Sequence, residues 1–273
     1  MTLFTKIYER DYQIMQKEEL KFKDSTVFEG MTSIRAILRG IDAGVNDRRI
    51  IKVLFDKEKI KKISKDVGYL KAVSEKYGYS VIETDGRELE KLTLGNSHGG
   101  LVALTESRTL PYLTDTSPII KDGFYVMIEG IEDPYNFGYS LRSLYAMGCS
   151  GIILTERNWM SAAGVVARSS AGASEMFTIY RSSPVECVRT FKNKGYKILC
   201  ADENTDNILG KCELKTPILL IVGGEKRGIS KAVIECADML VKINYAREFR
   251  ASLSAASATT MFAYEIARQN SLK

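Results

Sequence analysis

Two polar residues at the opening of a predicted helix could bind the reacting groups of a substrate. In segment 131–148, Asn136, Gly138 and Arg142 form the pattern N-x-G-x-x-x-R. Asn136 and Arg142 lie about a turn and a half apart, so both can border the end of a neighbouring strand. In the alternative interpretation Asn136 caps the helix, Gly138 allows close packing and Arg142 is an ordinary surface charge.

A glycine-rich turn follows a second apolar run. Segment 218–230 runs from a predicted buried strand into Gly223, Gly224, Glu225 and Gly228, just before a helix. Glycines let backbone N–H and C=O groups approach a ligand closely. The segment lacks the phosphate-loop pattern and the G-x-G-x-x-G pattern of dinucleotide-binding proteins. It is therefore either a tight strand-to-helix turn or a loop that binds a different ligand.

A third segment, 243–268, combines charge with small residues. Arg247 and Arg250 lie in a polar loop that leads into a helix rich in alanine and serine. Small side chains let a helix pack closely against another part of the backbone. A tightly packed C-terminal helix and a functional loop are compatible interpretations.

The elements expected to position these segments alternate between strand and helix. Apolar strands alternating with helices predict a parallel sheet covered on both faces, with ligands beyond the carboxyl ends of its strands. The predicted strands are 125–128, 151–154, 197–201, 218–222 and 239–243, and the predicted helices are 139–147, 184–193, 231–237 and 252–268.

The N-terminal half predicts a smaller α/β unit. Gly40 is expected to end its first helix, and Gly68 is a candidate break in a later one. The predicted helices are 31–40, 57–77 and a turn at 88–92, and the predicted strands are 50–55, 80–83 and 101–104.

The best domain boundary is a polar stretch with two prolines. Segment 108–118 (RTLPYLTDTSP) is typical of a linker. We therefore expect a charged, partly helical extension over residues 1–25, a domain over 26–108, a linker over 109–118 and a second domain over 119–273.

Composition restricts the environment of the protein. The 273 residues carry a net charge of +5, which permits a polyanionic partner without requiring one. The lysines between Lys57 and Lys65 are a solvated helix face or a nucleic-acid contact. Five scattered cysteines and a single histidine, His98, argue against a disulfide framework and a zinc site. No signal peptide or membrane-spanning run is recognised, so we expect a cytoplasmic protein.

Taken together, the three segments resemble the three motifs of the TrmH-like SPOUT methyltransferases. The resemblance extends from Phe124 to Arg268 and includes the family's S-x-G-A stretch, represented by Ser170, Gly172 and Ala173. The N-terminal half is similar to the ribosomal-protein-like domain that often precedes this catalytic domain and binds RNA. The similarity lies in segments 28–38 and 98–104.

The resemblance implies a fold, a cofactor and a reaction. We expect a SPOUT domain with a parallel sheet and a deep trefoil knot, preceded by a smaller α/β RNA-binding domain, in a homodimer. The expected donor is S-adenosylmethionine, and the acceptor is a ribose 2′-hydroxyl of RNA, with ribosomal RNA favoured over transfer RNA. The implied catalytic residues are Asn136, Arg142, Glu225 and Ser252, and the implied donor-binding residues are Val222, Gly223, Gly224, Gly228, Ile229, Ile243, Leu253 and Ser254, with no metal.

The third motif departs from the family pattern. Asn244 replaces the usual proline, Ser254 replaces the usual asparagine, and the loop between Ile243 and Ser252 is about one residue longer. Serine keeps a hydroxyl but loses the paired donor and acceptor of the amide.

Two further functions remain open. One is a non-catalytic RNA-binding or ribosome-assembly protein that retains the fold, and the other is methylation of a base. A serine hydrolase is disfavoured because the only histidine, His98, lies in the other predicted domain.

Overall fold

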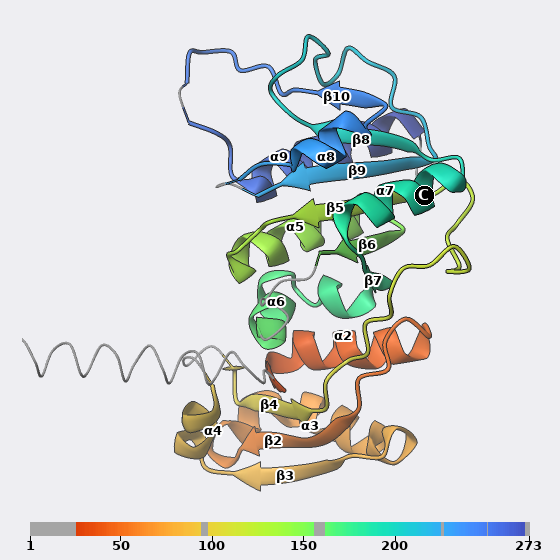
Figure 1. Cartoon of the computed structure of the whole chain (residues 1–273). Helices are drawn as coiled ribbons and strands as arrows, with labels where there is room; N and C mark the ends of the chain where they lie inside the picture. Colours follow the sequence, from red (N-terminus) through yellow and green to blue (C-terminus); the bar gives the residue numbers. More distant parts are fainter. Residues whose placement is uncertain (1–25, 94–97, 156–161, 225–226, 250, 271–273) are drawn as a thin grey trace, which may run out of the picture.

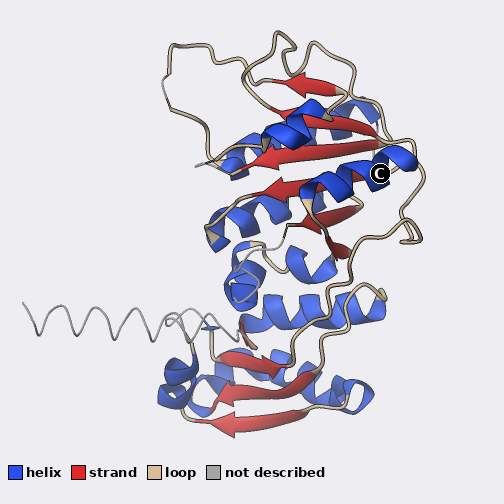
Figure 2. Ribbon diagram, viewed as in Figure 1, coloured by secondary structure: helices blue, strands red, loops and turns tan. Residues whose placement is uncertain are grey.

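The protein contains two β-sheets joined by a layer of helices (Figure 1, Figure 2). A computed structural model describes residues 26–93, 98–155, 162–224, 227–249 and 251–270. The larger sheet has the strand order β10-β8-β9-β5-β6-β7, and all its neighbours are parallel. Its strands are β5 (Phe124–Glu129), β6 (Gly151–Leu154), β7 (Ile179–Arg181), β8 (Lys197–Ala201), β9 (Ile218–Gly223) and β10 (Met239–Val241).

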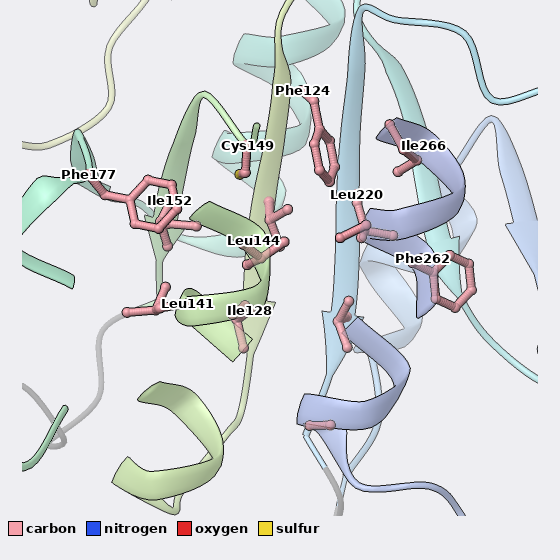
Figure 3. Packing of buried hydrophobic residues seen from close by; sticks show 14 of the residues in the cluster. Phe124, Ile128, Leu141, Leu144, Cys149, Ile152, Phe177, Leu220, Phe262 and Ile266 are labelled. Carbon is pink, nitrogen blue, oxygen red and sulfur yellow. The ribbon is translucent and has the colours of Figure 1, made fainter. Parts of the chain in front are cut away.

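Helices cover both faces of this sheet, as the continuous apolar strands predicted. Along β5, Phe124, Val126 and Ile128 face one core and Tyr125 and Met127 face the other, because successive side chains point to opposite faces. The first core is closed by α5 and α9 (Figure 3) and the second by α7 and α8. The helices of this half are α5 (Pro134–Ala146), α6 (Ala163–Ser169), the 3-10 turn η4 (Ala173–Met176), α7 (Pro184–Asn193), α8 (Lys231–Glu235) and α9 (Ala255–Asn270).

The smaller sheet has the order β1-β4-β2-β3 and mixed strand directions. Strand β4 is antiparallel to both β1 and β2, and β2 is parallel to β3. Its core includes Ala167 of α6, so the hydrophobic interior of the N-terminal half continues into the other half. The elements are β1 (Val27–Glu29), α2 (Gly30–Asp42), β2 (Ile50–Asp56), η1 (Lys57–Lys59), α3 (Ile60–Tyr77), β3 (Ser80–Thr84), α4 (Gly86–Leu92) and β4 (Leu101–Thr105).

Two glycine predictions in the N-terminal half were wrong. Helix α2 continues through Gly40 to Asp42. A Cβ at Gly40 would lie 2.1 Å from the carbonyl oxygen of Glu175, so this glycine permits contact between helix and backbone and does not end the helix. Helix α3 is unbroken at Gly68. The short strand β1 and helix α6 were not predicted.

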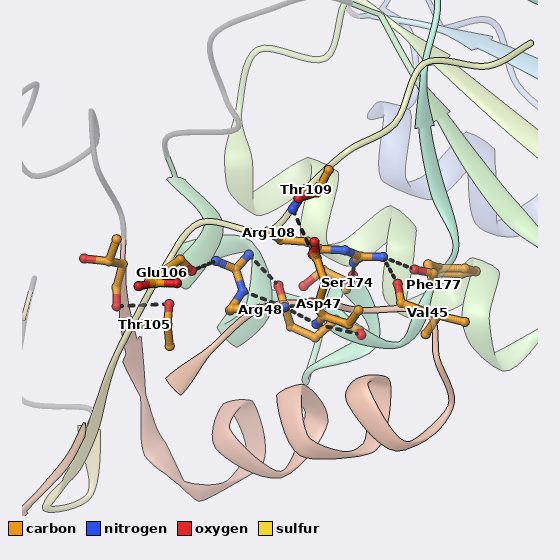
Figure 4. A network of polar contacts seen from close by, with 12 residues as sticks. Val45, Asp47, Arg48, Thr105, Glu106, Arg108, Thr109, Ser174 and Phe177 are labelled. Atoms are coloured by element: carbon orange, nitrogen blue, oxygen red, sulfur yellow. Dashed lines mark hydrogen bonds and ion pairs between the residues drawn. The ribbon is translucent and has the colours of Figure 1, made fainter. Parts of the chain in front are cut away.

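A buried ionic cluster joins the two halves (Figure 4). Arg48 Nε donates to Glu175 Oε2 at 2.9 Å, and Asn46 Nδ2 donates to the same oxygen at 2.7 Å. The guanidinium of Arg108 donates to the carbonyl oxygens of Val45, Ser174 and Phe177. Because these groups come from both halves, the cluster fixes their relative orientation.

The segment after Arg108 is also held in place. Thr109 N donates to Asp47 Oδ1 at 2.8 Å, and Tyr112 pairs with Arg181 as an isolated parallel bridge beside β7. The guanidinium of Arg181 lies 4.4 Å from the centroid of the Tyr112 ring. This segment therefore covers the outer edge of the larger sheet. Across the described part of the chain, no helix is long and apolar enough to cross a membrane.

Candidate functional site

The candidate site lies at the carboxyl ends of the parallel strands. Glu129, the last residue of β5, is in register with Gly223, the last residue of β9. Residues 130–133 follow β5, residues 224–230 follow β9, and residues 242–254 follow β10. Because the strands are parallel, these loops all begin at the carboxyl ends of the strands (Figure 1). Ligands bind at this end of the sheet in such folds.

The glycine turn after β9 contacts other parts of the protein backbone. A Cβ at Gly223 would lie 2.3 Å from the carbonyl carbon of Gly228, and one at Gly224 would lie 2.0 Å from the oxygen of Gly130. Gly228 N donates to Gly224 O at 2.9 Å, and Gly228 has φ of +60°. Gly223 and Gly224 are thus required by contacts within the protein. At Gly228 a Cβ would meet no atom of the described residues within 4 Å.

The aliphatic residues beside this turn belong to the core. Val222 is buried in the cluster that includes α5 and α9, and Ile229 is buried with α7 and α8. Ile243 is half-buried against the first of these clusters. Their packing anchors the loops to the hydrophobic core. Glu225, between Gly224 and Gly228, lies outside the described residues.

Glu129 is a site residue that the sequence analysis missed. Its Oε2 accepts a hydrogen bond from the backbone N of Ser230 at 3.2 Å. The carboxylate therefore ties the end of β5 to the start of α8 and anchors the loop between β9 and α8. An acidic residue directly after the apolar run FYVMI was the signal that could have identified it.

Helix α5 begins earlier than predicted and has a different cap. Asp133 is its N-cap and accepts from the backbone N of Tyr135 at 3.0 Å and of Asn136 at 3.4 Å. The interpretation of Asn136 as the cap was therefore wrong. A Cβ at Gly138 would lie 1.8 Å from Ser169 Oγ, so the expected close packing at this glycine is confirmed.

Asn136 and Arg142 occupy different environments on α5. Asn136 is half-buried in the first turn, whereas Arg142 is exposed. Six helical residues separate them by about 9 Å along the axis and about 120° around it. Arg142 makes no ion pair with any described residue, nor do the exposed Arg227 and Arg247 on the loops after β9 and β10. These three cations are available to an anionic ligand.

The third motif ends in a helix cap. The helix was predicted to begin at Ser252, but α9 begins at Ala255. Ser254 Oγ accepts from Ser257 N at 3.2 Å, and Ser254 O accepts from Ala258 N at 3.0 Å. Serine is a favourable N-cap, so the replacement of asparagine preserves the start of the helix. Ser252 is exposed, and the half-buried Leu253 donates its N–H to Tyr245 Oη at 3.1 Å.

The helices that carry these residues are packed together. Helix α9 lies against α5 and β9. Thr260 Oγ1 of α9 donates to Ser143 Oγ of α5 at 2.7 Å. At the other end of α9, Gln269 Nε2 donates to Cys212 O and Asn270 Nδ2 donates to Leu214 O. The position of Arg142 is therefore fixed relative to the turn at Ser252–Ser254. No group of His, Cys, Asp and Glu suited to a metal occurs among the residues with described positions.

The architecture is that of a SpoU-type methyltransferase fold. It matches the crystal structure of the SpoU methyltransferase AviRb from Streptomyces viridochromogenes in complex with the cofactor AdoMet, with a TM-score of 0.73, 24% sequence identity and coverage of 89% of each chain. An rRNA methyltransferase from Sinorhizobium meliloti gives a TM-score of 0.71 at 21% identity, over 89% of this chain and 86% of the other.

The chain belongs to the SpoU rRNA Methylase family, whose model matches residues 123–264, more than half of the sequence. This match confirms the resemblance inferred from the three segments.

Curated proteins from several bacteria are similar to this chain. The 23S rRNA (guanosine-2′-O-)-methyltransferase RlmB of Shewanella oneidensis is 27% identical over 71% of this chain and 80% of its own length. The putative TrmH family tRNA/rRNA methyltransferase YacO of Bacillus subtilis is 24% identical over 82% and 90%. An uncharacterized tRNA/rRNA methyltransferase of Mycolicibacterium gilvum is 28% identical over 71% of this chain, which spans only 63% of that protein.

Proposed function

We propose that the protein transfers a methyl group from S-adenosylmethionine to a ribose 2′-hydroxyl of RNA. The observation that carries this proposal is the SpoU family match over residues 123–264. That range contains the Gly223–Gly228 turn and Ser252–Ser254, on the loops that begin at the carboxyl ends of the strands, and Arg142 on α5, the helix that follows β5.

The residues at this edge fit a cofactor of this kind. Ile243 and Leu253 are half-buried and offer apolar surface, and Gly228, at which a Cβ would meet no described residue within 4 Å, lets a ligand approach peptide N–H and C=O groups. We assign donor binding to the turn 222–229 together with Ile243, Leu253 and Ser254. When bound, S-adenosylmethionine supplies an electrophilic methyl group.

The polar residues are assigned to the acceptor. Arg142 stays protonated at physiological pH, so it is assigned to binding phosphate or stabilising negative charge on the 2′-oxygen, not to removing the proton. Asn136, Ser252 and Glu225 are assigned to the same reaction centre. Orientation of two bound reactants lowers the activation barrier by about 7–11 kcal/mol in favourable cases. The packing of α5 against α9 is proposed to contribute by holding the acceptor-binding residues in fixed positions.

RNA binding is assigned to residues 26–108 as well as to the catalytic half, residues 119–273. Exposed lysines on α3, including Lys61, Lys62 and Lys65, can contact phosphates. The buried cluster around Glu175 holds this unit at a fixed orientation to the reaction edge. Ribosomal RNA is the favoured substrate over transfer RNA, in keeping with the 23S rRNA activity named for the Shewanella oneidensis relative.

The functional form is proposed to be a knotted homodimer in the cytoplasm. Helices α5 and α9 pack side by side and expose large side chains, namely Tyr139 and Tyr145 on α5 and Met261 and Tyr264 on α9. Two copies of this surface would bury them against each other. The free thiols of the five cysteines suit a reducing compartment.

The test begins with calorimetric titration of the protein with S-adenosylmethionine. Methyl transfer from the labelled donor to 23S rRNA and to tRNA transcripts follows, with Arg142→Ala as the inactive control. Nuclease digestion and mass spectrometry of the product distinguish a 2′-O-methyl ribose from a methylated base. Absence of donor binding by the folded dimer would contradict the proposal and favour a non-catalytic RNA-binding protein.

A further inference from the structure

We propose that Phe249, supported by Tyr245, is a stacking surface for an unpaired RNA base beside the site of methyl transfer. The proposal deepens the function given above and rests on it for the identity of the ligand as RNA. It is carried by three observations on the loop between β10 and α9: its path, the packing of its aromatic rings and its charge.

The loop passes along the edge where the candidate site lies. It leaves β10, the outermost strand of the larger sheet, and returns to α9, which packs against α5 and β9 near the centre. Figure 1 shows this path extending beyond the carboxyl ends of the strands. Phe249 lies midway along this loop, whose two ends, at Ile243 and at Leu253, are assigned to the donor.

Two aromatic rings in this loop support each other. The hydroxyl of Tyr245 accepts a hydrogen bond from Leu253 N at 3.1 Å, which ties the beginning of the loop to its end. The ring of Phe249 packs on Tyr245 with centroids 6.1 Å apart and planes at 62°. Phe249 is nevertheless 59% exposed. The structure thus holds a large apolar ring in place while leaving much of it open to solvent.

The surroundings of this ring favour a nucleobase as its partner. Arg247 lies between the two aromatic residues in the sequence, is exposed, and makes no ion pair with a residue whose position is described. An aromatic surface next to a free cation matches an unpaired nucleotide, whose base stacks and whose phosphate is anionic. A ribose can present its 2′-hydroxyl at the adjacent site while a base of the same strand rests on Phe249.

The experiment measures binding of fluorescently labelled single-stranded RNA, a 12-residue oligouridine, to the full chain and to Phe249→Ala. We expect the alanine variant to bind about 5- to 150-fold more weakly, the range for loss of one stacked base. Phe249→Trp should retain the affinity of the parent, because it keeps a stacking ring. Ile120→Ala is the control. Ile120 is 58% exposed, but it precedes β5 and therefore lies on the side of the amino ends of the strands, away from the candidate site.

A second arm removes the base from the ligand. An abasic ribose-phosphate 12-mer should bind the parent weakly and should bind Phe249→Ala equally weakly, so that the two changes are not additive. Additive losses, or equal binding of the oligouridine by the parent and Phe249→Ala, would overturn the inference. So would loss of S-adenosylmethionine binding or of dimerisation in Phe249→Ala, because the ring would then belong to the donor site or the subunit interface. Failure of the parent itself to bind S-adenosylmethionine counts against the proposed function alone, since the oligonucleotide binding is scored separately.

Discussion

Arg48 and Glu175, 127 residues apart in the sequence, form a buried ion pair between the two halves of the protein. Their side chains are only 6% and 4% exposed. Glu175 also accepts from Asn46, and Arg48 donates to the carbonyl oxygen of Glu106 at 3.0 Å. Because the polar groups of the pair are largely hydrogen-bonded, the contact can be stable in an apolar environment. The unit assigned to RNA binding is therefore held rigidly against the unit assigned to catalysis.

Removing one member of this pair should strongly destabilise the protein. Glu175→Leu leaves the Arg48 guanidinium buried without its carboxylate, and we expect a loss of about 3–5 kcal/mol in the free energy of unfolding. The double variant Arg48→Met, Glu175→Leu should lose less, because the Arg48 guanidinium is no longer left buried without its carboxylate. Urea unfolding measures both. A double variant less stable than Glu175→Leu would contradict this account.

Two glycines in helices should respond in opposite directions to alanine. Gly40→Ala places a Cβ 2.1 Å from Glu175 O and should destabilise the protein by about 1–3 kcal/mol. Gly68→Ala, in the middle of α3 with nothing within 4 Å of the new Cβ, should stabilise it by about 0.5–1 kcal/mol. Thermal or urea unfolding of both variants checks the signs. Stabilisation by both substitutions would mean that helix propensity, and not contact with Glu175, dominates at Gly40.

The contrast between these glycines shows what the sequence could predict. Strands 151–154 and 197–201 and helix 184–193 were predicted with the boundaries observed, because apolar runs and proline at a helix start are local signals. Gly40 was misinterpreted because its neighbour Glu175 is distant in the chain. Helix α6 was missed for a related reason: Ala167 packs into the core of the other half, which no local pattern indicates.

In the candidate site, too, local features could be predicted from the sequence, whereas contacts between distant segments could not. The three segments were found from their glycines and polar residues, and the order of the strands placed them at one edge. The role of Gly224 could not be predicted, since it depends on contact with Gly130 across the pairing of β5 with β9. The assignment of individual residues to catalysis and donor binding stays a prediction.

Arg142→Ala should lower catalysis without lowering stability. The side chain is exposed and has no ionic partner among the residues with described positions, so the free energy of unfolding should change by less than about 0.5 kcal/mol. Loss of a group that stabilises developing charge should reduce kcat at least about 100-fold, with donor affinity unchanged. Arg189→Ala, an exposed arginine on α7, is the matched control and should keep full activity. An active Arg142→Ala enzyme would remove this residue from the reaction centre.

Ser254 provides a test of the altered third motif. Ser254→Ala removes the oxygen that accepts from Ser257 N and should cost about 1 kcal/mol of stability. Ser254→Asn, which restores the family pattern, keeps a capping oxygen and should remain within a few tenths of a kcal/mol of the parent. Chemical unfolding and calorimetry with S-adenosylmethionine separate the cap from any role in donor binding. Equal stability of Ser254→Ala and the parent would exclude the capping role.

Acid should weaken the attachment of α9 through Glu265. The hydrogen bond from Arg268 lowers the pKa of this carboxyl below its ordinary value of 4.5; burial opposes the shift, and a hydrogen bond from Gln269 adds to it. Since the pKa is lowered on folding, the ionised carboxylate contributes stability that is complete above the ordinary pKa and is lost as the pH falls through the pKa of the folded protein. The same Gln269 side chain binds Cys212 O and Leu214 N, so the effect reaches the segment that holds the end of α9.

Glu265→Gln should therefore be less stable than the parent at pH 7 and should approach it as the pH falls below 4.5 and through the lowered pKa of the folded carboxyl, where the carboxylate of the parent becomes protonated. Urea unfolding at each pH gives the difference. A deficit that stays constant across this range would show that Glu265 acts by packing alone. A deficit that disappears on acidification would show that its charge helps to hold α9, and with it the turn at Ser254, against the rest of the candidate site.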